Sequence, residues 1–285
     1  MSFHQPPVTF VGQVNLKVQS LERSLAFYQE VIGFKVYEKT DKSAKLTADG
    51  KTVLLSLEQP SDVIPKKGRT TGLYHFALLL PDRTDLAKVL KHFLQTGYPL
   101  QGASDHLVSE ALYLADPDGN GIEIYTDRPA SQWEWNEQQV VMATQALDAE
   151  NLLAEVKEQA WNGLPARTVM GHIHLHVAEL AKTEEFYTQG LGFDVVSRYG
   201  PQALFISSGK YHHHIGLNTW NGLGAPVPPV NSVGLESFAL VLPDEASLNE
   251  TIASLKEIGA SVAEENGISI TADPSGNKIR LETAK

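Results

Sequence analysis

The sequence predicts an α+β protein built from four copies of one βαβββ unit, and its internal similarities are the evidence. Residues 18–34 resemble residues 177–193 in their apolar and glycine positions, so the two halves of the chain are copies of each other. A later segment repeats in the same way, because residues 76–82 resemble residues 238–244. Self-similarity of this kind sets the architecture, and here it places two similar units in each half.

Each unit follows the same order of predicted elements. It opens with a strand of alternating apolar and polar residues, continues through an amphipathic helix and closes with three short strands separated by Gly, Asp or Asn turns. In the first unit, apolar residues recur at helical spacing from Leu21 to Ile32, with Ser20 as the predicted cap and Gly33 as the helix end. The four units span residues 8–58, 72–127, 169–219 and 233–283.

The length predicts how the units are grouped. A chain of 285 residues is long enough for two domains of ordinary size. We expect the first pair of units in residues 1–127 and the second pair in residues 169–285. Residues 128–168 form a linker between the halves, and the linker contains a helical pattern near residues 149–159.

The composition excludes several classes of function. The net charge of −11 opposes binding to phosphate backbones and anionic lipid, so no nucleic acid or membrane partner is expected. The chain has no cysteine, so any metal has to be held by nitrogen and oxygen ligands. The first residues show no basic region followed by an apolar stretch, and no apolar run is long enough to cross a bilayer. We therefore expect a cytoplasmic protein. Self-association into a homo-oligomer stays open.

The first strands of the units carry candidate metal ligands. Alternate side chains of a strand share a face, so His172, His174 and His176 point to one side of the sheet. The apolar residues between them point to the other side and are expected to pack on the helix. The leading residues on the concave side of the four units are Gln13, His75, His172 and Ser237.

This whole-chain pattern, with strand openings such as residues 172–177 and 13–18, resembles the vicinal oxygen chelate superfamily of glyoxalases, bleomycin resistance proteins and extradiol dioxygenases. The resemblance implies that the units pair into curved half-barrels. These cup a metal held by the leading residue of a first strand and by a residue of a last strand. The last-strand position is Glu123 in the second unit, whereas in the fourth unit it is Arg280, a cation that would repel a divalent metal. The fourth unit has therefore lost both ligands.

The metal set that remains is His75, Glu123 and His172. Two histidines and one carboxylate on one face of a metal leave positions open for substrate and O2, as in non-haem Fe(II) oxygenases. Fe(II) is the expected cofactor, and Mn(II) accepts the same donors. These ligands come from the second and third units, whereas ring-cleaving relatives more often use the third and fourth. We infer that the two central units pair with each other.

Residues 106–123 resemble the extradiol ring-cleavage signature, which runs from a histidine through a tyrosine to the ligand glutamate. The resemblance implies that Tyr113 hydrogen-bonds a substrate hydroxyl and that His106 contacts the substrate or the oxygen pocket. Strand alternation puts His212 and His214 on one face with His213 facing away, and the resemblance implies His214 as the acid–base histidine. The expected reaction inserts O2 into a small aromatic diol of the catechol type and gives a muconic semialdehyde type of product.

Two other functions stay open. A glyoxalase-like isomerase or lyase would use Gln13, His75 and Glu123, with Glu58 as a further ligand, although Ser56 falls at that fourth position. A non-catalytic protein of this fold would bind a small aromatic ligand without needing iron, and the fold alone does not exclude it. Oxidation of a catechol under O2 tests the first alternative, and metal content tests the second.

Overall fold

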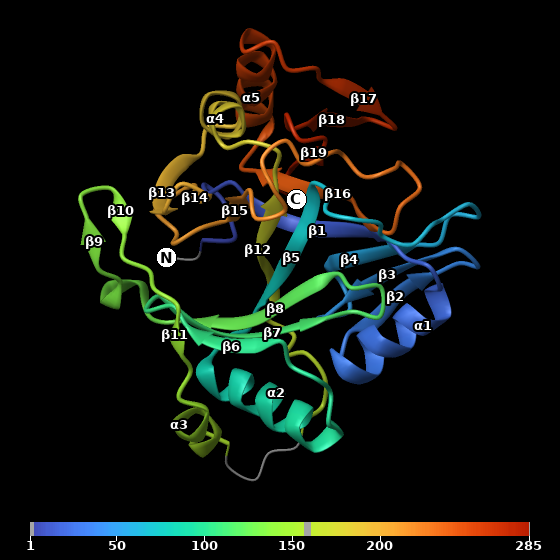
Figure 1. The fold of residues 1–285 in the computed structure, drawn as a ribbon, viewed down its shortest axis with the longest axis vertical. Helices are drawn as coiled ribbons and strands as arrows, with labels where there is room; N and C mark the ends of the chain where they lie inside the picture. The colour runs from blue at the N-terminus through green and yellow to red at the C-terminus, as the bar shows by residue number, and fades with distance from the viewer. Residues whose placement is uncertain (1–2, 157–160, 285) are drawn as a thin grey trace.

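The computed structural model describes residues 3–156 and 161–284, and it contains the four βαβββ units that the repeats predict (Figure 1). The units do not pair in chain order. The first unit shares a sheet with the fourth, and the second shares a sheet with the third. The inferred pairing of the two central units is therefore confirmed.

The outer two units form an eight-stranded sheet. The first unit consists of β1 (Phe10–Lys17), α1 (Leu21–Ala26), the π-helical turn η1 (Phe27–Val31), β2 (Lys35–Lys39), β3 (Ser43–Thr47) and β4 (Val53–Glu58). The fourth unit consists of β16 (Gly234–Leu242), α5 (Glu245–Glu257), β17 (Ala263–Glu265), β18 (Ile268–Ala272) and β19 (Lys278–Thr283). The strand order is β17-β18-β19-β16-β1-β4-β3-β2, so the antiparallel pair of β1 and β16 joins the two units.

The central two units form a nine-stranded sheet. The second unit consists of β5 (Gly72–Leu79), α2 (Arg83–Thr96), β6 (Gly102–Asp105), β7 (Ser109–Ala115) and β8 (Gly121–Asp127). The third unit consists of β12 (Val169–His176), α4 (Ala181–Glu185), η3 (Phe186–Gly190), β13 (Asp194–Tyr199), β14 (Ala203–Ser207) and β15 (Ile215–Asn218). With one linker strand, β11 (Gln145–Ala146), the order is β11-β6-β7-β8-β5-β12-β15-β14-β13.

The linker contains short elements, and some of them attach to the nine-stranded sheet. They are η2 (Ala130–Gln132), the hairpin of β9 (Trp135–Asn136) and β10 (Gln139–Val140), β11, and α3 (Ala149–Ala154). The strand β11 pairs with the edge strand β6, so the linker extends the sheet. The expected linker helix near residues 149–159 begins where the pattern predicts and ends earlier, and residues 157–159 lie outside the described residues.

Local sequence signals set the helix ends. The Ser20 hydroxyl accepts a hydrogen bond from the Arg23 amide at 3.3 Å and caps α1, as predicted. Asp82 caps α2 in the same way, and Gly97 ends that helix in the left-handed conformation with φ of 68°. None of the helices in the described part of the chain has the length and apolar character needed to span a membrane.

The two sheets pack against each other through their central strands, β1 and β12. In β12 the residues between the histidines, among them Ile173 and Leu175, are fully buried in the main apolar core. Figure 1 shows α1 beside the first unit's strands, α2 below the β6–β8 strands and α5 over the fourth unit. The face of this strand without histidines is buried in the apolar core, and the histidine face lies toward the concave side.

Candidate functional site

Three adjacent strands in the middle of the nine-stranded sheet bring the candidate ligands together. Ala77 in β5 is the register partner of both Glu123 in β8 and His172 in β12. Laterally paired residues share a face of the sheet, and His75 lies two positions before Ala77 on the same strand. The methyl group of Ala77 is small, so the three larger side chains have room to converge above it.

The convergence is close. The Oε2 atom of Glu123 lies 3.1 Å from Nε2 of His75 and 3.2 Å from Nε2 of His172. All three side chains are buried, and their ligand atoms lie within 4.8 Å of one another. The structure thus brings together the three residues that the sequence pattern predicts as metal ligands.

The electrostatics of this cluster suit a cation. Burial raises the pKa of Glu123, but the nearby His172 and His75 imidazoles, with the hydrogen bond of His172, outweigh burial and hold the pKa well below its ordinary value. Burial also lowers the pKa of His172 to about 4, against the opposing effect of Glu123. At neutral pH the site therefore combines an ionised carboxylate with an unprotonated His172 imidazole, the forms in which these groups bind metals.

One nitrogen atom of the three candidate ligands lacks a hydrogen-bond partner. Nε2 of His75 is buried and has no aligned hydrogen-bond partner, although the carboxylate oxygen is near. Buried polar atoms are normally paired, so this atom needs an explanation. A divalent cation between the three donors would satisfy it, and the set of two histidines and one carboxylate is the facial triad of non-haem iron oxygenases. The residues present fit such a metal.

A cavity of about 400 Å³ opens beside the triad. His75 and Glu123 are in its wall, together with Tyr113 and His106, whereas His172 lies behind the wall with 1% of its side chain exposed. An open space next to two of three ligands leaves room for a substrate at the remaining metal positions. The structure thus groups five of the six predicted site residues around one cavity.

The two signature residues Tyr113 and His106 form a hydrogen-bonded pair. Nδ1 of His106 lies 2.7 Å from the carbonyl oxygen of Ala143, and Nε2 lies 2.6 Å from the hydroxyl of Tyr113. A carbonyl only accepts, so Nδ1 carries the hydrogen, and in that tautomer Nε2 accepts a hydrogen bond from the Tyr113 hydroxyl. Burial, followed by the charge of Glu123, raises the pKa of Tyr113 well above its ordinary value, so it stays a phenol.

The structure does not bring His214 to the cavity. Its Nε2 lies 2.9 Å from the carbonyl oxygen of Phe3, and its Nδ1 accepts a hydrogen bond from the Ser208 amide at 3.2 Å. His213 is in the cavity wall instead, with its ring centroid 4.1 Å from that of His172. The two histidines do face different ways, but it is His213 and not His214 that lines the cavity; the strand begins only after these histidines, so strand alternation does not assign their faces.

His213 is held by a buried chain of polar groups. The carboxylate of Asp127 lies 2.8 Å from Nε2 of His212, and Nδ1 of His212 lies 2.8 Å from Nδ1 of His213. A carboxylate accepts, so Nε2 of His212 carries the hydrogen and its Nδ1 is the acceptor. His213 then donates from Nδ1, and this leaves its Nε2 without a hydrogen and able to accept a proton.

The cavity wall also contains residues that the sequence pattern does not indicate as site residues. Tyr74, Phe205 and Trp220 are aromatic members of the wall, and Met142 comes from the linker. Trp220 and Phe205 flank His174, with ring centroids 5.3 and 5.5 Å away. Tyr74 and Phe205 lie in β5 and β14 of the same two units as the triad, whereas Trp220 and Met142 lie outside the strands; the one available signal was the clustering of aromatic residues and histidines in the third unit.

The eight-stranded sheet has no comparable donor set among the predicted positions. Gln13 donates from Nε2 to Oδ1 of Asn15 at 2.6 Å and to the hydroxyl of Ser56 at 2.8 Å, and Asn15 donates to the hydroxyl of Ser237 at 3.0 Å. Arg280 pairs with Glu282 on the same strand. The alternative ligand set of Gln13 with His75 and Glu123 is wrong, because Gln13 lies in the other sheet and is engaged there.

Paired βαβββ units around a buried cluster of two histidines and one carboxylate are the arrangement that the sequence pattern predicts. Residues 11–124 and 169–281 match the Glyoxalase/Bleomycin resistance protein/Dioxygenase superfamily, and the chain belongs to that superfamily. Solved structures agree on the fold. A putative dioxygenase from Bacillus subtilis has a TM-score of 0.64 at 13% identity, covering 96% of this chain and 84% of that one. Glyoxalase I from Zea mays has a TM-score of 0.60 at 17% identity, covering 96% and 92%.

Two relatives are similar over most of the sequence. The catechol-2,3-dioxygenase of Bacillus subtilis strain 168 is 50% identical over 275 residues, which cover 95% of this chain and 96% of that protein. The 2,2',3-trihydroxybiphenyl dioxygenase of Sphingomonas paucimobilis is 24% identical over 251 residues, which cover 85% and 74%.

Proposed function

We propose that this protein is an extradiol ring-cleaving dioxygenase that acts on an aromatic diol of the catechol type. The observation that carries the proposal is the convergence of His75, Glu123 and His172 beside a cavity that also contains the Tyr113 and His106 pair. Similarity to two dioxygenases, one of them at 50% identity, supports the same activity.

His75, Glu123 and His172 would hold the metal, and we propose Fe(II). When bound, it would supply Lewis acidity and the redox capacity to couple diol oxidation to O2 reduction. The reaction balances as one catechol plus one O2, with cleavage of the ring bond beside the diol. Both oxygen atoms enter the product, which is a muconic semialdehyde.

Tyr113 and His213 have complementary parts in handling the substrate protons. The hydrogen of Tyr113 is committed to His106, so its oxygen can accept a hydrogen bond from one substrate hydroxyl. Nε2 of His213 can take the proton of a hydroxyl and return it later, because Asp127 and His212 fix the hydrogen of its other nitrogen. The proposed acid–base histidine is therefore His213 in place of His214.

The test is oxygen uptake and formation of the yellow ring-opened product by protein loaded anaerobically with Fe(II), using catechol as the first substrate. We expect His172→Ala to abolish both signals and to lower the bound iron. Gln13→Ala is the matched control, because Gln13 and His172 open the first strands of their units on the concave side but lie in different sheets. Activity that survives in His172→Ala and is lost in Gln13→Ala would reverse the assignment of the site.

Metal content tests the remaining alternative of a non-catalytic binding protein. The wild-type protein is expected to bind about one metal ion per chain, and Mn(II) loading in parallel decides between the two metals. Diol binding that is unaffected by removal of the metal, together with no oxygen uptake, would favour the binding protein.

A further inference from the structure

We propose that His174 contacts the substrate and donates a hydrogen bond from Nδ1 to an oxygen atom of the bound diol. His174 lies in the wall of the triad cavity, and the handling of substrate protons by Tyr113 and His213 does not involve it. The inference rests on the proposed dioxygenase function and deepens it, because it assigns a further contact at the same site. Its evidence is the hydrogen bonding and packing of the imidazole, which can be tested without turnover.

His174 is a neighbour of the metal ligands in the nine-stranded sheet. It lies two positions after His172 on β12, and it is the register partner of His75 on β5. Laterally paired residues share a face of the sheet, so the side chain of His174 lies on the same concave face as the triad. The ring centroids of His174 and His75 are 5.0 Å apart. Both residues are in the cavity wall, so a molecule that reaches the triad through the cavity also reaches His174.

Asn218 determines which nitrogen of His174 carries the hydrogen. The Trp220 amide lies 3.0 Å from Oδ1 of Asn218, and a backbone amide only donates, so this side-chain atom is identified as the oxygen. The same oxygen accepts from Nδ1 of His176 at 2.7 Å. The other end of the amide, Nδ2, lies 2.9 Å from Nε2 of His174 and donates to it. Nε2 therefore carries no hydrogen, and the neutral imidazole has its hydrogen on Nδ1.

The hydrogen on Nδ1 of His174 has no acceptor in the described part of the chain. The one hydrogen bond of this side chain is the bond that Nε2 accepts from Asn218. His174 is 3% exposed, and Nδ1 does not belong to the polar atoms that the protein encloses completely, so this atom is open to the cavity. Polar atoms in protein interiors are normally paired. A buried donor that faces a cavity without a partner indicates that its acceptor is a ligand.

Packing holds the imidazole of His174 in one position. Gly216 on β15 is its register partner, and a Cβ atom added to Gly216 would lie 2.8, 2.9 and 3.0 Å from three atoms of the ring. The ring therefore lies over the backbone of β15, in space that a side chain at position 216 would occupy. Phe205 and Trp220 confine it from other sides. A group that acts through a single donor atom needs this kind of support, because a shift of about 0.5 Å already weakens its contact.

A fixed donor suits the substrate oxygen that loses its proton. In the proposed reaction His213 takes the proton of one hydroxyl, and the negative charge that remains on the oxygen is stabilised by hydrogen-bond donors. Tyr113 does not supply this bond, because its hydrogen is committed to His106. The serine and threonine hydroxyls of the wall can donate or accept, whereas His174 can only donate to the cavity because Asn218 occupies its acceptor nitrogen. His174 thus stabilises the charge without exchanging a proton.

Two substitutions of nearly equal shape isolate the donor. His174→Asn and His174→Leu both remove the ring and leave a branched side chain of similar size, but the asparagine amide can donate from near the position of Nδ1. We expect His174→Leu to weaken catechol binding about tenfold or more, and His174→Asn to weaken it less than about threefold. The affinity is measured by titration calorimetry on anaerobic Fe(II)-loaded protein, where no turnover occurs. The iron content of each variant checks that the triad is still loaded.

Asn15→Leu is the matched control. Asn15 occupies in the first unit the position that His174 occupies in the third, but it lies in the other sheet and donates to Ser237. This variant should bind catechol with wild-type affinity, and thermal unfolding checks the folding of all three variants. A second readout needs no substitution for its result: ¹⁵N NMR of histidine-labelled protein loaded with diamagnetic Zn(II), which accepts the same donors. The His174 signals, assigned by their loss in His174→Asn, should show the hydrogen on Nδ1.

The outcomes separate this inference from the proposed function. Equal catechol affinities of the leucine and asparagine variants would overturn the donor role, and so would a hydrogen found on Nε2 of His174. Wild-type anaerobic affinity in His174→Leu, with a lower kcat/KM for O2 alone, would overturn the assignment of the contact to the diol. Catechol binding that depends on the donor, with no oxygen uptake by the wild-type protein, would overturn the dioxygenase function and leave the contact standing. No binding of catechol to the wild-type protein would overturn both.

Discussion

The close approach of β5 and β8 allows a sharp test of how the fold sets the metal site. Gly121 in β8 is the register partner of His75, and a Cβ atom added to it would lie 2.1 Å from the carbonyl oxygen of Tyr74 and 3.1 Å from Cβ of His75. Ordinary van der Waals contact begins at 3.4 Å, so Gly121→Ala requires a displacement of about 1.3 Å. The obstructing atom belongs to the backbone and cannot rotate away.

The displacement falls between the two strands that carry His75 and Glu123. Metal–ligand distances tolerate changes of about 0.2 Å, so a strand shift of this size should lower metal affinity about 100-fold or more. Overpacking at this position should lower the free energy of unfolding by about 3 kcal/mol. The assays are metal affinity by chelator competition and urea unfolding of the metal-free protein, which measure the two effects separately.

Gly102→Ala is the control for this test. Gly102 also lies in a strand of the same sheet, but a Cβ atom there meets nothing within 4 Å and its backbone is not left-handed. We expect it to change stability by less than about 1 kcal/mol and to leave metal affinity unaltered. If Gly121→Ala retains wild-type metal affinity and stability, the register of β5 and β8 does not set the ligand geometry.

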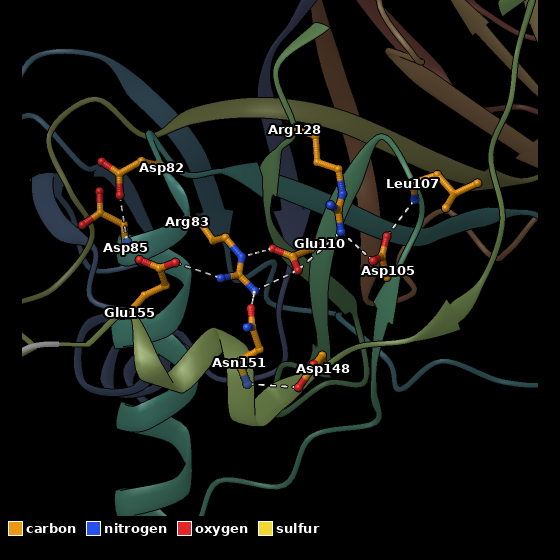
Figure 2. A network of polar contacts seen from close by, with 10 residues as sticks. All are labelled: Asp82, Arg83, Asp85, Asp105, Leu107, Glu110, Arg128, Asp148, Asn151 and Glu155. Atoms are coloured by element: carbon orange, nitrogen blue, oxygen red, sulfur yellow. Dashed lines mark hydrogen bonds and ion pairs between the residues drawn. The ribbon is translucent and has the colours of Figure 1, made fainter. Parts of the chain in front are cut away.

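Three further predictions follow from the site and its surroundings. His213→Asn should lower kcat about 100-fold or more in oxygen uptake, whereas His214→Asn should lower it far less, and the opposite order would restore the assignment from sequence. A double-mutant cycle with Arg83→Met and Glu110→Gln should give a coupling of about 2 kcal/mol in urea unfolding, and a coupling near zero would show that the pair in Figure 2 does not stabilise the protein. Burial lowers the pKa of His176 from 6.5 to about 4, so the unfolded chain binds more protons than the folded one between these values, and stability falls as pH drops through this window. The loss from this residue, after allowance for partial exposure, is about 2 kcal/mol, and His176→Gln should reduce the slope of unfolding free energy against pH below pH 6.5; an unchanged slope would contradict it.

The repeats made the fold and the triad predictable from sequence. Comparing equivalent positions in the four copies shows which residues lie on the same face of a sheet. The first and last strands of each unit are neighbours in the sheet and pair in parallel. His75 and Glu123 could therefore be placed on one face without a structure. The third ligand, His172, was predicted because it occupies in the third unit the position that His75 occupies in the second. Since the ligands come from these two units, the sequence also predicted that the second and third units pair.

The acid–base histidine and the linker were harder to predict for a physical reason. His213 lies between β14 and β15 in a turn stabilised by the hydrogen bond from the Tyr211 amide to the Ser208 carbonyl, where strand alternation has no meaning. The linker has no repeat partner and little periodicity, so nothing in its sequence indicates that β11 would pair with β6 or that Met142 would reach the cavity. Both features depend on contacts between segments that are distant in the chain.

The nested pairing of units has a consequence for how the chain folds as it is synthesised. When residues 1–127 have left the ribosome, β5 already carries His75 beside Glu123 of β8, but its other edge has no neighbour until β12 is made. The same holds for β1, which waits for β16, near the end of the chain. Two open strand edges are thus exposed during synthesis, and such edges attract other unpaired strands. The nascent first half is therefore the form of this protein most exposed to misassociation, and the metal site can close only after the third unit has been synthesised.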